Sequence, residues 1–136
     1  RPDMPPYRFI KWIAEEETIQ MFGDGSQSRD FTYVDDIARG TIAAIQDVGY
    51  EIINLGGGRN PVSLNAITAK LEELLGKKAK IDHKPFHLAD LMETWADISK
   101  AKNLLGWEPQ VSLEKGLEKS VQWYIENRNW LKEIFV

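Results

Sequence analysis

The stretch from Gly23 to Asp36 joins three kinds of local structure in a short length of chain. Gly-Asp-Gly-Ser at 23–26 is typical of a turn, because glycine adopts positive φ without steric cost. The range 29–34 is predicted to be a strand, since its aromatic and β-branched residues suit a pleated, half-buried surface. Asp35 or Asp36 then supplies an oxygen that caps a helix beginning at Ile37. The stretch therefore predicts a turn, a strand and a helix in succession.

Arg29 stands where this turn enters the predicted strand. A strand in a packed sheet holds a guanidinium rigidly, and a guanidinium binds phosphate or carboxylate through forked hydrogen bonds. An arginine followed by an aspartate, here Asp30, is also often a local ion pair at the surface. Both interpretations of Arg29 stay open on these residues alone.

Short strands and helices alternate along the rest of the chain. Further strands are predicted over 18–22, 51–55 and 79–83, and the first could pair with 29–34 in a hairpin-like unit across the turn. Glycines at 56–58 indicate a flexible loop. Helices are predicted over about 5–16, 37–46 and 64–75. A short helix that Asp97 or Ser99 caps is predicted to stop at Gly106, and Ser112 is predicted to cap the last helix. The sequence predicts a small α/β domain of helices around a few short strands, with too few strand-helix units for a doubly wound sheet.

Two helices have apolar sides that predict how they are buried. The clearest period belongs to the helix over 64–75, which Ser63 caps and Gly76 ends in the left-handed conformation. Its predicted buried side is Leu64, Ile67, Leu71, Leu74 and Leu75. The predicted buried side of the helix over 37–46 is Ile37, Ala38, Thr41, Ile42 and Ile45.

Composition excludes several classes of protein. At 136 residues the chain is one domain at most, and a hydrophobic content of 43% suffices for a core. The formal net charge is -4 without a basic run, which argues against nucleic-acid binding. Cysteine is absent, so thiol catalysis and Cys-ligated metals are excluded. No apolar run approaches the roughly 20 residues that span a bilayer, so we expect a soluble cytoplasmic protein without a membrane partner.

Five ordered motifs resemble the C-terminal half of NAD-dependent nucleotide-sugar epimerases and dehydratases, the extended short-chain dehydrogenase family. The motifs are Arg-Pro-Asp-Met at 1–4, Gly-Asp-Gly-x-x-x-Arg-Asp-Phe-x-Tyr-Val-Asp-Asp at 23–36, Tyr-Glu-Ile-Ile-Asn-Leu-Gly at 50–56, the run over 94–109 with Ala-Asp-Ile-Ser-Lys-Ala and Leu-Gly-Trp-Glu-Pro, and Ser-Leu-Glu-Lys-Gly-Leu at 112–117. The resemblance covers nearly the whole chain. Within the family, the segment at 1–4 points most towards UDP-glucuronate 4-epimerases.

The resemblance implies a set of substrate-binding residues. Arg29 matches the arginine that contacts the diphosphate, and Arg1 matches one near the sugar ring that pairs with the glucuronate carboxylate. Asp90 matches the acid that accepts from ribose hydroxyls, and His87 replaces the family residue near the phosphates. Phe9 and Gln20 lie in segments that border the uridine pocket.

The motifs for the cofactor and for catalysis are missing. Tyr7 and Lys11 have the Tyr-x-x-x-Lys spacing of the family's catalytic pair, but they follow the segment at 1–4 that the catalytic pair should precede. We therefore interpret them as ordinary helix residues. The glycines at 56–58 lack the last glycine of a dinucleotide fingerprint, because Pro61 stands in its place. The resemblance then implies that residues 1–136 are a C-terminal substrate-binding domain, without catalytic or cofactor-binding residues, and that the absent N-terminal Rossmann domain binds NAD.

A metal site is a weaker interpretation of this chain. His83, His87 and Asp90 include two metal-ligand types, but Pro85 breaks any helical pairing of the histidines, so we expect no metal.

Two classes of function remain open. The first is the UDP-sugar-binding part of an epimerase that acts through a 4-keto intermediate, or of a dehydratase or decarboxylase. In that case we expect the fragment to be inactive and the full-length enzyme to be a homodimer. The second is a non-catalytic protein-interaction module. A fragment that exposes the face of a missing domain is also expected to self-associate or to have marginal stability.

Overall fold

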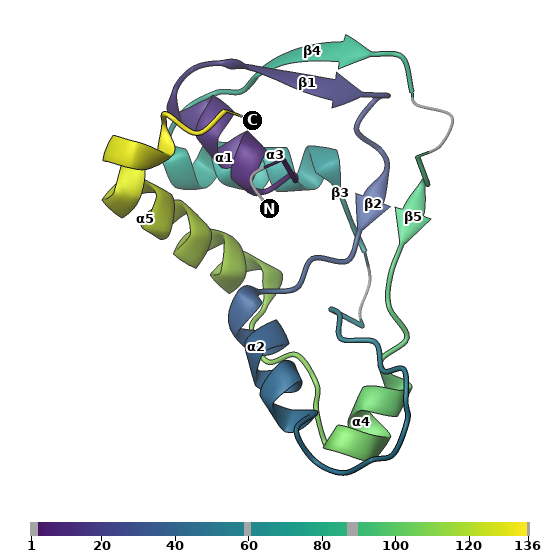
Figure 1. The fold of residues 1–136 in the computed structure, drawn as a ribbon. Coiled ribbons are helices and arrows are strands. Elements are labelled where there is room, and N and C mark those ends of the chain that lie inside the picture. Colours follow the sequence, from purple (N-terminus) through teal and green to yellow (C-terminus); the bar gives the residue numbers. More distant parts are fainter. Residues whose placement is uncertain (1–2, 59–60, 87–89, 136) are drawn as a thin grey trace. The chain divides into compact units, whose positions relative to one another are not determined.

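The computed structural model of the chain describes residues 3–58, 61–86 and 90–135 and divides the chain into two compact units. The first unit combines Arg1–Gln27, Ser63–Met92 and Leu117–Val136, and the second combines Ser28–Val62 and Glu93–Gly116. Helices and short strands occur in both units (Figure 1). The α/β class predicted from the sequence is confirmed.

The first unit contains helices α1 (Tyr7–Ala14) and α3 (Leu64–Leu75), which contact each other, and most of α5 (Leu113–Leu131). Strands β1 (Thr18–Phe22) and β4 (Lys80–Lys84) form a two-stranded parallel sheet. The core consists of apolar side chains from all of these helices and from β1: Phe9, Ile10, Ile13, Ile19, Met21, Ile67, Leu71, Leu117, Val121 and Tyr124.

Helix α3 confirms the sequence prediction at both of its ends. The Ser63 side chain accepts a hydrogen bond from the Ala66 amide at 3.2 Å, and Gly76 ends the helix with φ +63°. Leu71 is among the side chains of the apolar period that are buried. Local periodicity sufficed here because one apolar stripe faces one core.

The hairpin-like unit predicted across the 23–27 turn is wrong, because β1 pairs with β4. Backbone groups of the turn are used elsewhere in the first unit. The Gly23 amide donates to the Lys84 carbonyl at 2.8 Å, and the Gly25 carbonyl accepts from the Asn65 amide at 3.0 Å. These bonds join the turn to β4 and to the start of α3, so the turn does not close a hairpin.

The second unit contains strands β2 (Ser28–Arg29) and β5 (Glu93–Thr94) and helices α2 (Val34–Ala43) and α4 (Ser99–Leu105). Strand β2 lies between β5 and β3 (Val62–Ser63) in a three-stranded sheet, and it runs parallel to β5. The Trp107 ring is almost completely buried in this unit.

Asp36 has a different role from the helix cap predicted for Asp35 or Asp36. Helix α2 begins at Val34, its N-cap is Tyr33, and no side chain caps it. The buried Asp36 carboxylate instead accepts from the amides of Gln110 at 3.0 Å and Val111 at 2.9 Å. A residue of the first helical turn is thus used to hold a segment distant in sequence.

The cap prediction for the short helix also needs correction. The N-cap of α4 is Ile98, which makes no side-chain cap bond, although the Asp97 carboxylate accepts from the Ser99 amide at 2.9 Å. The last helix follows its prediction, since the Ser112 hydroxyl accepts from the Lys115 amide at 3.3 Å.

Three further predictions for the second unit are wrong. The strand predicted over 29–34 ends at Arg29, because the Asp30 side chain engages the glycine loop and α2 starts at Val34. The range 51–55 forms no strand, since no strand lies beside it among the residues that the structure describes. The predicted buried side of α2 is largely exposed, with Ile42 and Ile45 facing outward and Asp36 and Gly40 facing inward.

None of the helices in residues 3–58, 61–86 and 90–135 is both long and apolar enough to cross a membrane.

Candidate functional site

Arg29 ends strand β2, in the sheet of the second unit. Its side chain is half-buried, and one guanidinium nitrogen donates to the carbonyl of the preceding Ser28 at 2.7 Å. Strand pairing of Arg29 with Thr94 fixes the backbone that carries this side chain. The strand predicted as a rigid mount for the guanidinium is therefore present, though it is shorter than expected.

Asp30 is turned towards the glycine loop at 56–58. One of its carboxylate oxygens accepts a hydrogen bond from the Gly58 amide at 2.6 Å. A Cβ added to Gly57 would lie within 1.9 Å of the other oxygen, Oδ1, so only glycine permits this approach. Gly58 itself has φ +60°, which favours glycine further. The loop is therefore built around the Asp30 carboxylate.

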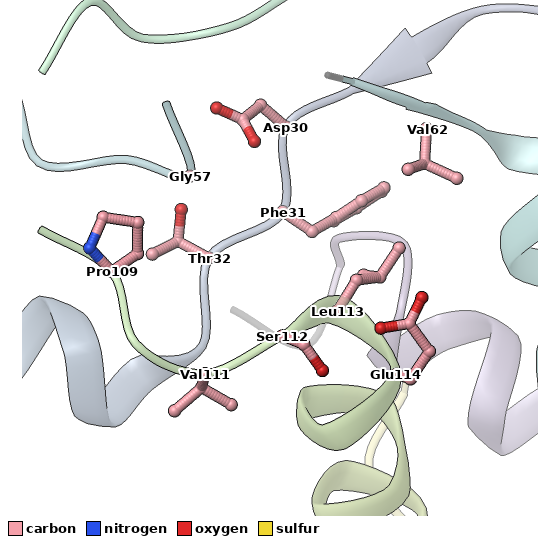
Figure 2. A pocket seen from close by; sticks show the side chains of 10 residues that line it. All are labelled: Asp30, Phe31, Thr32, Gly57, Val62, Pro109, Val111, Ser112, Leu113 and Glu114. Carbon is pink, nitrogen blue, oxygen red and sulfur yellow. The ribbon is translucent and has the colours of Figure 1, made fainter. Parts of the chain in front are cut away.

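A cavity of about 320 Å³ opens beside Asp30 in the second unit. Figure 2 shows Asp30 and Gly57 on one side of it, with Ser112, Leu113 and Glu114 at the start of α5 on another. The remaining lining residues are Phe31, Thr32, Val62, Pro109 and Val111. The volume lies within the range of small-molecule sites.

The lining of the cavity combines carboxylates and hydroxyls with apolar walls. Asp30 and Glu114 contribute negative charge, and Thr32 and Ser112 contribute hydroxyl groups. Within the described part of the chain no basic side chain lines it. Because like charges repel, a diphosphate or a sugar carboxylate would be unfavourable here. The cavity suits hydroxyl or cationic groups, so an anionic group is better matched to Arg29.

Asp36, Arg39 and Trp107 join α2 to the segment over 107–111 in this unit. Arg39 bonds the Asp36 carboxylate and also donates to the Glu108 carbonyl at 2.9 Å, and the Trp107 indole donates to the Asp36 carbonyl at 2.9 Å. Burial raises the pKa of Asp36, but bonds from the Val111 amide, the Arg39 guanidinium and the Gln110 amide outweigh it and lower the pKa below its ordinary value. Asp36 is therefore a charged group that supports the structure.

The other predicted site residues within the described ranges belong to the first unit. Gln20 is exposed on β1, and its amide lies 3.5 Å from the Asp82 carboxylate. Phe9 is buried in the core and stacks on Trp12, with ring centroids 6.3 Å apart. The Asp90 carboxylate accepts from the Leu91 amide at 2.9 Å. Neither these three nor Arg29 lines the cavity, and the burial of Phe9 favours a structural role for its ring.

Arg1 and His87 lie outside the described residues, so their proposed contacts stay predictions. Within the ranges that the structure describes, no group of three or more histidine, aspartate and glutamate side chains could hold a metal. His83 has its Nδ1 atom 2.8 Å from the Gly23 carbonyl oxygen.

Tyr7 and Lys11 lie one helical turn apart on α1, in the spacing of a catalytic pair. The Tyr7 hydroxyl donates to the Leu131 carbonyl at 3.2 Å, and the Lys11 ammonium donates to the Ile134 carbonyl at 2.6 Å. Burial raises the pKa of Tyr7, whereas a catalytic tyrosine needs a lowered one. Both side chains fasten the end of α5 to α1, which supports their interpretation as structural residues.

The glycine loop at 56–58 does not fit a dinucleotide. A phosphate-binding loop leaves its amides free for the ligand, whereas here Gly58 donates to Asp30 and the space beside Gly57 is filled by the Asp30 carboxylate. A carboxylate in this position would also repel a pyrophosphate. The loop is part of the protein's own packing.

A comparison with protein-family models matches residues 7–120 to the family described as GDP-mannose 4,6 dehydratase. The chain belongs to this family. Among curated relatives, UDP-glucuronate 4-epimerase of Thermodesulfobacterium geofontis is 62% identical over 100% of this chain and 42% of its own length. UDP-N-acetyl-alpha-D-glucosaminuronate decarboxylase of Bacillus cytotoxicus is 33% identical over 90% of this chain and 40% of its own length.

Solved structures of similar proteins agree with the fold. The UDP-glucuronic acid 4-epimerase of Bacillus cereus, in complex with UDP-glucuronic acid and NAD, has a TM-score of 0.85 at 42% identity and covers 93% of this chain. This chain covers 41% of that protein. The chain thus spans about two-fifths of the length of these relatives.

The sequence alone did not reveal the cavity. Its walls come from the segment after β2, the glycine loop and the start of α5. The sequence predicts these segments as a strand, a flexible loop and the beginning of a helix, respectively. In the sequence, the position of Asp30 next to Arg29 was the one feature that pointed to this region as a site. The meeting of these segments depends on tertiary packing.

Proposed function

We propose that this chain is the nucleotide-sugar-binding part of a UDP-glucuronate 4-epimerase whose remaining length binds NAD. The observation that carries the proposal is the 62% identity to a UDP-glucuronate 4-epimerase over the whole chain, which matches only 42% of that relative. In the similar Bacillus cereus protein, UDP-glucuronic acid and NAD are bound together. The residues described here contribute binding of the substrate and no catalytic group.

Arg29 is proposed to bind the diphosphate. Its backbone is paired in a sheet, and its guanidinium offers forked donors to phosphate oxygens. Arg1, His87, Asp90 and Gln20 are the further proposed substrate contacts, and the buried Phe9 is proposed to support the uridine pocket without contacting the substrate. Because the glycine loop is filled by Asp30, we place the NAD site in the rest of the protein, where bound NAD would supply the redox chemistry.

A chimeric enzyme tests this proposal. The matched 42% of the Thermodesulfobacterium geofontis epimerase is replaced by this chain, and conversion of UDP-glucuronate to its C4 epimer is followed by proton NMR. An active chimera would show that the chain supplies a working substrate-binding part. An inactive chimera that folds and binds NAD would refute the proposal.

The Arg29 role is tested within the same chimera. Loss of a charge-assisted fork costs about 1.5–3 kcal/mol, so Arg29→Ala is expected to raise KM for UDP-glucuronate by roughly 10- to 100-fold. Arg8→Ala is the matched control, because Arg8 bonds the Asp3 carbonyl and lies over the Trp12 ring in the first unit. Equal KM values for the two variants would show that Arg29 is structural.

A decarboxylase is the second candidate, favoured by the 33% identity to the Bacillus cytotoxicus enzyme. Release of carbon dioxide from UDP-glucuronate by the chimera would select it over the epimerase. Binding of a partner protein without any turnover would favour a non-catalytic interaction module. A homodimeric full-length enzyme and a cytoplasmic location stay predictions.

A further inference from the structure

The 23–27 turn leads directly into the strand that carries Arg29. Gly23 and Gly25 have φ of +81° and +78°, and the turn ends at Gln27, two residues before Arg29. Glycines leave the backbone of a turn free to adopt many conformations unless other groups hold it. The conformation of this turn therefore depends on the contacts that it makes with the rest of the first unit.

The start of α3 holds the turn from outside. The first amides of a helix have no carbonyl partner within the helix. Here the Leu64 amide donates to the Gln27 carbonyl at 3.1 Å, and the Asn65 amide donates to the Gly25 carbonyl at 3.0 Å. The turn thus supplies the acceptors for the first two amides of α3, and the helix fixes two carbonyls of the turn.

The Asn65 side chain adds a third bond to the same turn. Its Nδ2 amide donates to the Asp24 carbonyl at 2.9 Å. A Cβ added to Gly25 would lie 2.1 Å from Asn65 Oδ1, so the side chain is in direct contact with the turn. Because Asn65 is exposed, its amide can be removed without opening a cavity in the core of the first unit.

Gln27 holds the turn from inside. The residue is only 2% exposed, and its Nε2 amide donates to the Phe22 carbonyl at the end of β1, which joins the residue before the turn to the last residue of the turn. Within the described part of the chain, its buried Oε1 atom accepts no hydrogen bond. A buried oxygen without a donor destabilises a fold, so an apolar side chain of the same length would suit folding at least as well. The glutamine contributes the bond across the turn.

We propose that Gln27 and Asn65, which we call the turn clamp, are positioning residues for substrate binding that fix the backbone from which Arg29 presents its guanidinium. Only Ser28 separates Gln27 from Arg29, so the link between the clamp and the guanidinium is a short piece of chain. The clamp raises affinity because the turn is ordered before the substrate binds, and neither residue needs to touch the substrate. This inference rests on the proposed function, in which Arg29 binds the diphosphate.

Steady-state kinetics of the chimera test the turn clamp. Gln27→Met keeps the length of the side chain and removes the bond to Phe22, and Asn65→Ala removes the bond to Asp24. Loss of one such bond is expected to raise KM for UDP-glucuronate by roughly three- to tenfold, with kcat within about twofold of the parent value. Parent-like KM values for both variants would overturn the proposal.

The matched control is an asparagine that makes an equivalent bond elsewhere. Asn127 lies on α5, and its Nδ2 amide donates to the Trp123 carbonyl at 2.9 Å, the same length as the bond from Asn65 to Asp24. Asn127→Ala is expected to leave KM unchanged. A rise in KM for Asn127→Ala equal to that for Asn65→Ala would show a general effect of the lost bond and would overturn the proposal.

Two further measurements separate positioning from a merely structural role. In an Arg29→Ala background the clamp variants should raise KM no further, because no guanidinium remains to be positioned, whereas additive increases would overturn the proposal. The Tm of Gln27→Met should equal or exceed that of the parent chimera, since the buried Oε1 atom is removed. A KM increase found only in variants with a lowered Tm would assign the clamp to folding alone. Should Gln27→Met fail to fold, Asn65→Ala decides the outcome by itself.

Calorimetric titration with UDP distinguishes this result from failure of the proposed function. A chimera that does not turn over UDP-glucuronate, but whose affinity for UDP falls without additivity in Arg29→Ala and in both clamp variants, supports the turn clamp and refutes the epimerase. An active chimera whose KM is the same in the parent and in both clamp variants does the opposite.

Discussion

The network around Glu15 predicts an acid-sensitive contribution to the stability of the first unit. Glu15 follows the end of α1, and the Arg128 guanidinium of α5 donates to its two carboxylate oxygens at 2.7 and 2.8 Å. The Tyr124 hydroxyl donates to the same carboxylate at 2.9 Å. The hydrogen bond from Arg128 is the largest influence that lowers the pKa of Glu15, to about 2, against the opposing effect of burial. Glu15→Gln, which keeps the size of the side chain and removes its charge, is the perturbation.

The pKa of Glu15 sets an upper limit on the effect. A fall from 4.5 to about 2 corresponds to roughly 3.4 kcal/mol of folding free energy, at about 1.36 kcal/mol for each pH unit. The Arg128 side chain is 52% exposed, so solvent screening reduces this value. We therefore expect Glu15→Gln to lower the free energy of unfolding by about 1–2 kcal/mol at pH 7.

The sign of the pH dependence follows from the lowered pKa. A carboxyl that ionises more readily when folded stabilises the fold above its unfolded pKa, and this contribution is lost as pH falls through the folded pKa. Urea unfolding followed by far-UV circular dichroism should show the difference between wild type and Glu15→Gln shrinking from about pH 4.5 to about pH 2. Glu17→Gln, at an exposed neighbouring position, is the control. A difference that stays constant with pH, or an NMR titration of Glu15 near its ordinary pKa, would refute the reasoning.

Two further substitutions test the second unit. Asp36→Ala leaves the amides of Gln110 and Val111 without their acceptor, so we expect about 3 kcal/mol of destabilisation and faster hydrogen exchange at both amides. A cost below about 0.5 kcal/mol would show that the carboxylate bonds contribute little. Gly57→Ala must displace the Asp30 carboxylate, so we expect it to lower the free energy of unfolding by about 1–3 kcal/mol in thermal unfolding. Asp30→Ala in the same chain should relieve part of that cost. Strictly additive costs of the two substitutions would argue against the contact.

The regular parts of this protein could be predicted because they depend on neighbouring residues. The apolar period of α3, its Ser63 cap and its Gly76 end are all local signals, and the structure has each of them. Strand β1 has the predicted bounds Thr18–Phe22 for the same reason. The family could also be predicted from the sequence, because five ordered motifs constrain a chain far more than any single one.

Pairing and burial were decided by the tertiary structure. Strands β1 and β2 follow each other along the chain but do not pair, because backbone groups of the 23–27 turn form hydrogen bonds with β4 and with α3. Asp36 was predicted as a possible cap but is buried, because a segment far along the chain supplies donors that no local pattern can show. The glycine loop was predicted to be flexible but is shaped by the Asp30 carboxylate.

The sequence by itself determined the α/β class, the helices, the positions of β1 and β4 and the motif around Arg29. Which face of α2 is buried, and where Asp30, Gly57 and the start of α5 meet, were decided only in three dimensions. The physical reason is that a helix period shows that an apolar face exists, whereas the neighbour that covers it depends on segments far apart in sequence. For Ile42 and Ile45, that neighbour is absent from the described residues, which is why a face predicted to be buried is exposed.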